Sequence, residues 1–197
     1  MTGYFLVVWL LVYFAVAFVL PSYRVWKRTS VNPVTFRGAD NAHDYIGKLF
    51  KIVMAALASV VFVFAFAPDI YKFLLPVVWL ENQIIQFLGI GLLLLSLGWT
   101  VLAQIQMGNS WRIGIDEEKH TALVRAGLFR FSRNPIFLGM VVSLLGFFLT
   151  IPNALTLLFL VLGFVLLQIQ IRLEEEFLSG LHGKEYTEYR RMVRRWL

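Results

Sequence analysis

Long apolar runs separated by short charged segments dominate the pattern of the chain. Each run approaches the length of about 20 mostly apolar residues that a helix needs to cross a bilayer, so each predicts a transmembrane helix. Five runs occur, over residues 4–20, 49–67, 84–107, 136–150 and 154–171. The fourth run is short, so we expect its helix to begin below the level of the lipid headgroups.

Two connections between these runs also predict structure. Only residues 151–153 separate the last two runs, which predicts a tight helical hairpin. Residues 73–80 are apolar as well, but Pro76 and Glu81 interrupt the run. We expect this segment to be a short interfacial piece on the outer face of the membrane.

Beyond the fifth run, the pattern changes from continuously apolar to amphipathic. Apolar residues recur at helical spacing on both sides of Gly183, which predicts a pair of helices lying on the membrane surface. These residues are Leu173, Phe177, Leu178, Leu181, Tyr186, Tyr189, Val193 and Trp196.

The composition excludes several classes of protein. Of the 197 residues, 59% are hydrophobic and 15% are charged, whereas a soluble domain has about 45–50% apolar and about 25% charged residues. An aromatic content of 16% also argues against a disordered chain. There are no cysteines, so disulfides, thiolate metal sites and thiol nucleophiles are excluded.

The basic residues indicate the orientation of the chain. Every Lys and Arg except Lys72 falls in residues 22–51, 107–135 or 172–197. By the positive-inside rule these three segments are cytoplasmic, with the N-terminus outside and the C-terminus inside. The positive charge is therefore topological, and we expect no nucleic-acid partner. The predicted fold is an all-α integral membrane protein of the bacterial inner membrane, with five transmembrane helices and cytoplasmic amphipathic C-terminal helices.

A first candidate site precedes the fourth run. Arg133, Asn134 and Pro135 open its helix, with Asn134 at the N-cap and Pro135 at the first helical position. The free N–H groups of a helix start can hold a carboxylate. The alternative is a capped loop with Arg133 at the headgroups.

A second candidate site follows the fifth run. Three consecutive carboxylates, residues 174–176, are unusual at the end of a membrane span. Glu174 lies one turn after Gln170, so both side chains can face the interior of the bundle. The alternative is a solvated acidic patch paired with Arg172 and Lys184.

Together the two sites resemble the isoprenylcysteine carboxyl methyltransferase family and its relatives among the membrane phospholipid methyltransferases. The family pattern has Leu-Val-x-x-Gly-x-Tyr, then Arg-His-Pro-x-Tyr-x-Gly, a helical hairpin, and Glu-Glu-x-x-Leu ahead of Gly-x-x-Tyr-x-x-Tyr. The corresponding residues here are Leu123, Val124, Gly127, Phe129, Arg133, Asn134, Pro135, Phe137, Gly139, Glu174, Glu175, Leu178, Gly183, Tyr186 and Tyr189. Order and spacing agree over roughly residues 100–197.

This resemblance implies a cytoplasm-facing S-adenosylmethionine pocket closed by the C-terminal helices, and an acceptor that enters from the bilayer. It divides the chain into an N-terminal membrane part, residues 1–83, and a methyltransferase core, residues 84–197. Carried over by position, the cofactor-binding residues are Thr121, Leu123, Val124, Phe129, Asn134, Pro135, Phe137 and Glu174.

The chain departs from the family pattern at three places. Asn134 replaces a histidine, and phenylalanines at 129 and 137 replace tyrosines. Gln170 stands where prenylcysteine methyltransferases have an arginine that meets the substrate carboxylate, and Arg172 lies roughly 200° further round the helix. This argues against a prenylcysteine carboxylate as acceptor. The candidate catalytic residues are Glu174, Gln170 and Arg172.

The implied function is S-adenosylmethionine-dependent methylation of a small hydrophobic or lipid-like acceptor, in contact with membrane lipids. An anionic acceptor needs no metal and no acid–base pair, whereas an amine must lose a proton, for which His182 and Glu175 are the nearby candidates. The alternative is a non-catalytic accessory or transport component on the same scaffold. Transporters tend to carry ionisable residues within their spans, and these five runs hold none deep inside.

Overall fold

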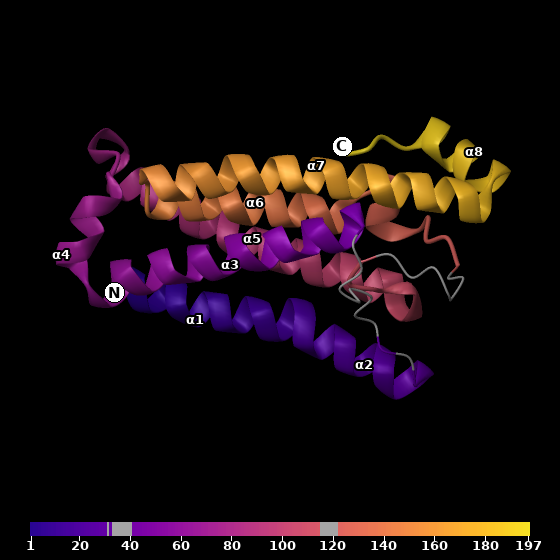
Figure 1. Ribbon diagram of the computed structural model, residues 1–197, viewed down its shortest axis with the longest axis horizontal. Helices are drawn as coiled ribbons and strands as arrows, with labels where there is room; N and C mark the ends of the chain where they lie inside the picture. The colour runs from indigo at the N-terminus through magenta and orange to yellow at the C-terminus, as the bar shows by residue number, and fades with distance from the viewer. Residues whose placement is uncertain (31, 33–40, 115–121) are drawn as a thin grey trace.

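The computed structural model describes residues 1–30, 32, 41–114 and 122–197. Five apolar helices run side by side along the long axis of the molecule (Figure 1). Four of them are long and apolar enough to cross a membrane, namely Thr2–Thr29, Ala42–Phe66, Gln83–Met107 and Ala154–His182. The fifth, Pro135–Thr150, is apolar but shorter. The predicted all-α membrane fold is confirmed.

The first helix is continuous through α1 (Thr2–Phe14), a π-helical turn η1 (Ala15–Val19) and α2 (Leu20–Thr29). The helix therefore extends beyond the apolar run over residues 4–20 and continues through a polar, amphipathic segment. Pro21 has no N–H to offer the Ala17 carbonyl one turn earlier. The side chain of Gln104 donates to this carbonyl instead, at 2.7 Å, so the backbone group remains satisfied.

The next two long helices both begin at an asparagine cap. Asn41 accepts a hydrogen bond from Asp44 N at 2.8 Å at the start of α3 (Ala42–Phe66). Asn82 accepts one from Ile85 N at 3.0 Å at the start of α5 (Gln83–Met107). These caps satisfy backbone donors that have no partner within the helix.

The predicted hairpin consists of α6 (Pro135–Thr150) and α7 (Ala154–His182). A reciprocal capping box between Asn153 and Thr156 fixes the turn. The first of the two predicted amphipathic helices is not separate, because α7 continues through it to His182. The break comes at Gly183, whose φ of +52° an L side chain rarely adopts. The second predicted helix is α8 (Lys184–Met192).

Short helices cover the hairpin turn at the end where the N-terminus lies (Figure 1). They are α4 (Pro68–Tyr71), η2 (Lys72–Leu74) and η3 (Val78–Leu80). Val77 N donates to Pro152 O at 2.9 Å, and Ala154 N donates to Leu75 O at 3.1 Å. The segment that the sequence predicts as an interfacial piece therefore forms short helices against the hairpin turn, and its place at the outer face stays a prediction.

Small residues allow α5 and α6 to pack closely. A Cβ atom on Gly89 would lie 2.6 Å from Thr150 N and 2.8 Å from Gly146 O, so only glycine fits there. Ser143 and Ser96 are hydrogen-bonded across the same interface at 2.8 Å. Close backbone approach and a polar contact of this kind are typical of helices that pack within a membrane. The hairpin is thereby held against α5.

Candidate methyl-transfer site

The difference in length between α6 and α7 places the start of α6 beside the second half of α7. α6 ends and α7 begins at the same turn, but at 1.5 Å per residue α6 (16 residues) is about 24 Å long and α7 (29 residues) about 43 Å. The start of α6 therefore lies beside α7 well before α7 ends. Polar side chains from both segments meet there.

At the centre of this meeting point lies Glu175, which we group with Arg133, Asn134 and Arg195 as the Glu175 cluster. Arg195 holds the carboxylate with two hydrogen bonds, from Nε at 3.1 Å and from Nη2 at 2.7 Å. Arg133 Nη2 lies 3.3 Å from Glu175 Oε1. Donating these hydrogen bonds to Glu175 raises the pKa of the Arg195 guanidinium. Two guanidinium groups thus neutralise one buried carboxylate.

Asn134 occupies the N-cap position and Pro135 the first helical position, as predicted. The Asn134 side chain, however, makes no capping hydrogen bond. Its Nδ2 atom donates to Arg195 O at 3.1 Å and lies 3.5 Å from Glu175 Oε1. The expected cap is therefore wrong, because tertiary partners take the side chain.

The C-terminal residues fold back over the start of α6, and we call residues 189–195 the C-terminal latch. Arg133 N donates to Arg194 O at 3.0 Å, and the Tyr189 hydroxyl donates to Phe129 O at 2.7 Å. Burial raises the pKa of Tyr189 to about 12 and also raises that of Tyr186. Both hydroxyls therefore stay protonated at neutral pH, and Tyr189 remains a donor to the Phe129 carbonyl.

Arg133 keeps unused hydrogen-bonding capacity inside this cluster. Its side chain is 8% exposed, yet Nε and Nη1 are buried and have no hydrogen-bond partner among the residues described. Unsatisfied guanidinium donors in a buried position cost free energy unless an anion meets them. A carboxylate is the kind of ligand that would satisfy these two N–H groups.

A second group of polar side chains lies on another face of α7, and we call it the Gln170 cluster. Gln170 Nε2 donates to Glu174 Oε1 at 2.9 Å and lies 3.5 Å from His43 Nδ1 on α3. This contact confirms that Gln170 and Glu174 face the same way. Gln170 Oε1 is buried without a partner within the described part of the chain. The cluster thus offers hydrogen-bond acceptors, whereas the Glu175 cluster offers donors.

The structure brings together some predicted residues and separates others. Asn134 contacts Glu175, whereas Glu174 contacts Gln170, because neighbours on a helix point about 100° apart. Arg172 bonds back to Gln168 on the exposed side and joins neither cluster.

The remaining predicted cofactor residues lie around the start of α6. Pro135 and Phe129, the latter in η5 (Gly127–Arg130), are buried, and Leu123, Val124 and Phe137 are half-buried. Thr121 lies outside the described residues. Within the described ranges, no three His, Asp or Glu residues are arranged to hold a metal ion.

Two residues of these clusters were missed by the sequence reasoning. His43 follows the Asn41 cap on the charged side of α3, and its polar type near a helix start is the only sequence signal for it. Arg195 is one of several arginines in the C-terminal tail, and nothing in the local pattern distinguishes it. Both come from segments far from their partners in sequence.

A comparison with protein families supports the resemblance. The family described as phospholipid methyltransferase matches residues 84–185, which is more than half of the chain. The matched stretch includes α5 except its first residue, all of α6 and all of α7, with the residues that α7 contributes to both clusters. No curated protein and no solved structure matches the chain. The chain belongs to the phospholipid methyltransferase family, and its apolar helices make it an integral membrane protein.

Proposed function

We propose that this protein transfers a methyl group from S-adenosylmethionine to a lipid-like acceptor that arrives from the bilayer. The family supports methyl transfer in a membrane. The observation that carries the cofactor assignment is Arg133, whose buried Nε and Nη1 lack partners among the described residues. We further propose that this end of the bundle faces the cytoplasm, with the N-terminus outside.

The two clusters suit the two ends of the cofactor's amino-acid portion. Arg133 would hold the carboxylate, because a guanidinium matches a carboxylate in geometry and charge. Glu174 and the free Gln170 Oε1 would accept from the ammonium or balance positive charge nearby. The half-buried aromatic and aliphatic residues at the start of α6 would cover the apolar parts.

When bound, S-adenosylmethionine supplies an electrophilic methyl group on a sulfonium. The protein's own contribution is then to position the acceptor in line with that methyl and to exclude water. The C-terminal latch supports this role, since it covers the start of α6 through hydrogen bonds to Arg133 and Phe129.

The family's description favours a phospholipid acceptor, and an amino headgroup would have to lose its proton. Glu175 is poorly suited to accept it, because two arginines already neutralise its charge. His43 is better placed, since its Nδ1 lies 3.5 Å from Gln170 in the acceptor-rich cluster. We assign His43 the role of proton acceptor for an amine.

Isothermal titration of the purified full chain with S-adenosylmethionine and with its demethylated product tests the proposal. We expect saturable binding of both. An absence of saturable binding to folded protein would contradict the enzyme assignment and favour the accessory or transport component.

A matched pair of variants tests the face of α7 that meets the donor. Glu174→Gln keeps the shape but removes the charge, and hydrogen bonds to charged groups are worth about 1.5–3 kcal/mol. Donor affinity should therefore fall roughly 10- to 150-fold. Glu176→Gln changes an exposed residue by the same chemistry and should leave affinity unchanged. If Glu176→Gln weakened binding and Glu174→Gln did not, S-adenosylmethionine would bind at the other face of α7.

A further inference from the structure

A pocket separate from both clusters lies between the first helix and the end of α5. Its volume is about 150 Å³, and it is lined by α2, η1, the last two turns of α5 and the residues that follow. Leu20 and Val101 belong to its apolar wall, and Arg24 and Arg28 to its charged wall. We propose that this pocket binds the headgroup of an anionic phospholipid, independently of methyl transfer.

The residues that line the pocket lie at the depths of the acyl chains and the headgroup of a lipid in one leaflet. The first helix has 28 residues and is therefore about 42 Å long, whereas the apolar core of a bilayer is about 30 Å thick. Counted from Thr2, the core ends near Pro21. Leu20 thus lies at the level of acyl chains, and Arg24 and Arg28 lie at the level of phosphate groups.

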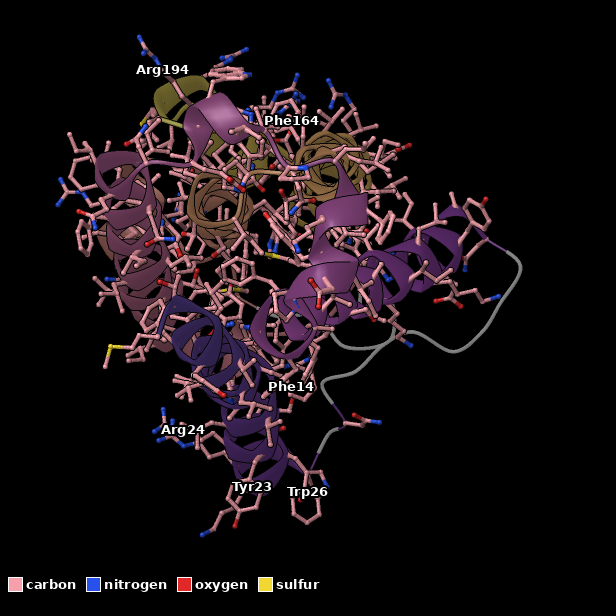
Figure 2. The ribbon with its side chains drawn as sticks, turned by 90° about the vertical axis from the view of Figure 1, so that its left-hand side faces the viewer. Phe14, Tyr23, Arg24, Trp26, Phe164 and Arg194 are labelled. Carbon is pink, nitrogen blue, oxygen red and sulfur yellow. The ribbon has the colours of Figure 1, made fainter. Side chains whose placement is uncertain are left out.

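Aromatic side chains support the same depth. Tyr23 and Trp26 are 52% and 56% exposed on α2, and Tyr and Trp concentrate at the interface between apolar core and water. Figure 2 shows Arg24 and Trp26 leaving α2 on different sides. One side of the helix can therefore anchor at the interface while the arginines line the pocket.

The charge in the pocket calls for an anion. Arg24 and Arg28 lie four residues apart, on one face of α2. Neither has an ion pair within the described part of the chain, and both are exposed. Two neighbouring guanidinium groups at phosphate depth complement a phosphodiester.

The inner wall of the pocket contains a hydrogen-bond acceptor that needs a donor from the ligand. Gln104 lines it and is 7% exposed, with Nε2 used by the Ala17 carbonyl. Its Oε1 is a buried acceptor with no partner in the ranges that the structure describes. A headgroup hydroxyl would satisfy this acceptor. Phosphate and hydroxyls together describe a phosphatidylglycerol-type headgroup.

The size of the pocket limits what it encloses. A cavity of about 150 Å³ is large enough to take one benzene ring, so it holds the phosphate and its glycerol but not a whole lipid. The acyl chains would remain in the bilayer along the apolar wall. The lipid would then be bound by its headgroup, and the two arginines would set its preference for negative charge.

Trp111 lines the pocket and is buried, which provides a local reporter. The full chain in zwitterionic micelles is titrated with brominated phosphatidylglycerol, because bromine quenches tryptophan on contact. We expect saturable quenching with phosphatidylglycerol and not with brominated phosphatidylcholine. Trp111→Phe should remove the saturable component.

Two double variants separate specific binding from general attraction. Arg24→Gln with Arg28→Gln should weaken binding about tenfold or more, because charged hydrogen bonds are lost. Arg190→Gln with Arg191→Gln removes the same charge from an exposed part of α8 and should have no effect. Equal weakening in both pairs, or equal quenching by phosphatidylcholine, would overturn the proposal.

Competition distinguishes a lipid from a soluble anion. Glycerol phosphate at the same concentration should not displace phosphatidylglycerol, and full displacement would identify a free-phosphate site instead. The Arg24 and Arg28 double variant should bind S-adenosylmethionine like the parent chain. Failure of the lipid site is therefore distinguishable from failure of the proposed function.

Discussion

Two adjacent glutamates on α7 have opposite surroundings. Glu175 is held by two guanidinium groups, whereas Glu174 receives a single amide hydrogen bond, from Gln170. The first carboxylate is neutralised by the protein itself and fixes the C-terminal latch. The second has no ion pair within the described part of the chain, so it can accept further hydrogen bonds from a ligand. Similar side chains one residue apart therefore serve structure and, in our proposal, binding.

At this scale, Arg133→Gln should weaken binding of S-adenosylmethionine roughly 10- to 150-fold. The variant removes the unpaired N–H groups that we assign to the carboxylate of the cofactor. Titration calorimetry measures the loss. Arg195→Gln is the control, since it also deprives Glu175 of a partner but removes no unpaired donor. If Arg195→Gln weakens binding equally, Arg133 acts only through Glu175.

Sequence spacing predicted the contact of Gln170 with Glu174, because residues four apart share a helix face. It could not predict that Asn134 meets Glu175, since this depends on the rotation of α7 about its axis. That rotation is set by packing against α3 and α6. His43 and Arg195 could not be predicted either, because tertiary folding brings them to their partners. His43 is 127 residues from Gln170, and Arg195 is 20 residues from Glu175.

At the scale of elements, apolar runs located the helices but not their ends. The first helix and α7 both continue as amphipathic helices past the point where the apolar run stops. The backbone hydrogen-bond ladder does not require apolar side chains, so a change in composition is not a helix end. Two glycines with positive φ do mark helix ends, Gly108 after α5 and Gly183 after α7.

The packing of α5 on α6 gives a prediction for stability. Gly89→Ala places a Cβ atom against backbone atoms of Thr150 and Gly146, so the thermal stability in detergent should fall, by about 1–3 kcal/mol. Gly91→Ala lies on the same helix, where a Cβ meets nothing within 4 Å. It should be neutral or slightly stabilising. Equal effects would show that the interface is looser than described.

The C-terminal latch gives a prediction that depends on pH. The Tyr189 pKa is raised from 10.0 to about 12, so the folded state favours the neutral hydroxyl. This stabilisation is complete below pH 10 and is lost as pH rises from 10 to 12. Tyr189→Phe should lower stability by about 0.5–1.5 kcal/mol at neutral pH.

Thermal unfolding between pH 7 and 12 measures both effects. The variant should lose less stability than the parent chain over the alkaline part of this range, since the titrating hydroxyl is gone. Tyr186 remains in both proteins as an internal reference. If the variant and the parent chain lose stability equally at alkaline pH, the pKa of Tyr189 is the same in the folded and unfolded states.

At the scale of the whole molecule, the described basic residues other than Lys72 gather toward one end of the bundle. α2, the start of α6 and α8 lie at that end, and α4 with the N-terminus lies at the other (Figure 1). This separation follows from alternation of apolar runs and charged segments. It was predictable from sequence because successive helices run in opposite directions, which brings the segments after the first, third and fifth apolar runs to the same end (Figure 1).

Introduced cysteines test the orientation, since the chain has none of its own. Lys72→Cys should react with an impermeant maleimide added to intact cells, and Arg125→Cys and Arg191→Cys should react only after permeabilisation. Labelling of all three in intact cells would contradict the predicted side for the basic segments. If residues 72 and 125 both react only after permeabilisation, they lie on the same side, which would contradict the number of crossings.

The shortness of α6 has a consequence for the surrounding lipid. At about 24 Å it falls about 6 Å short of the apolar core, so hydrophobic mismatch should thin the bilayer where Leu145 faces it. Thinning would lower the inner headgroups toward Asn134 and shorten the path of a lipid amine to the start of α6. Methylation in reconstituted vesicles should therefore fall as acyl chains lengthen. A rate independent of bilayer thickness would show that the membrane does not supply this approach.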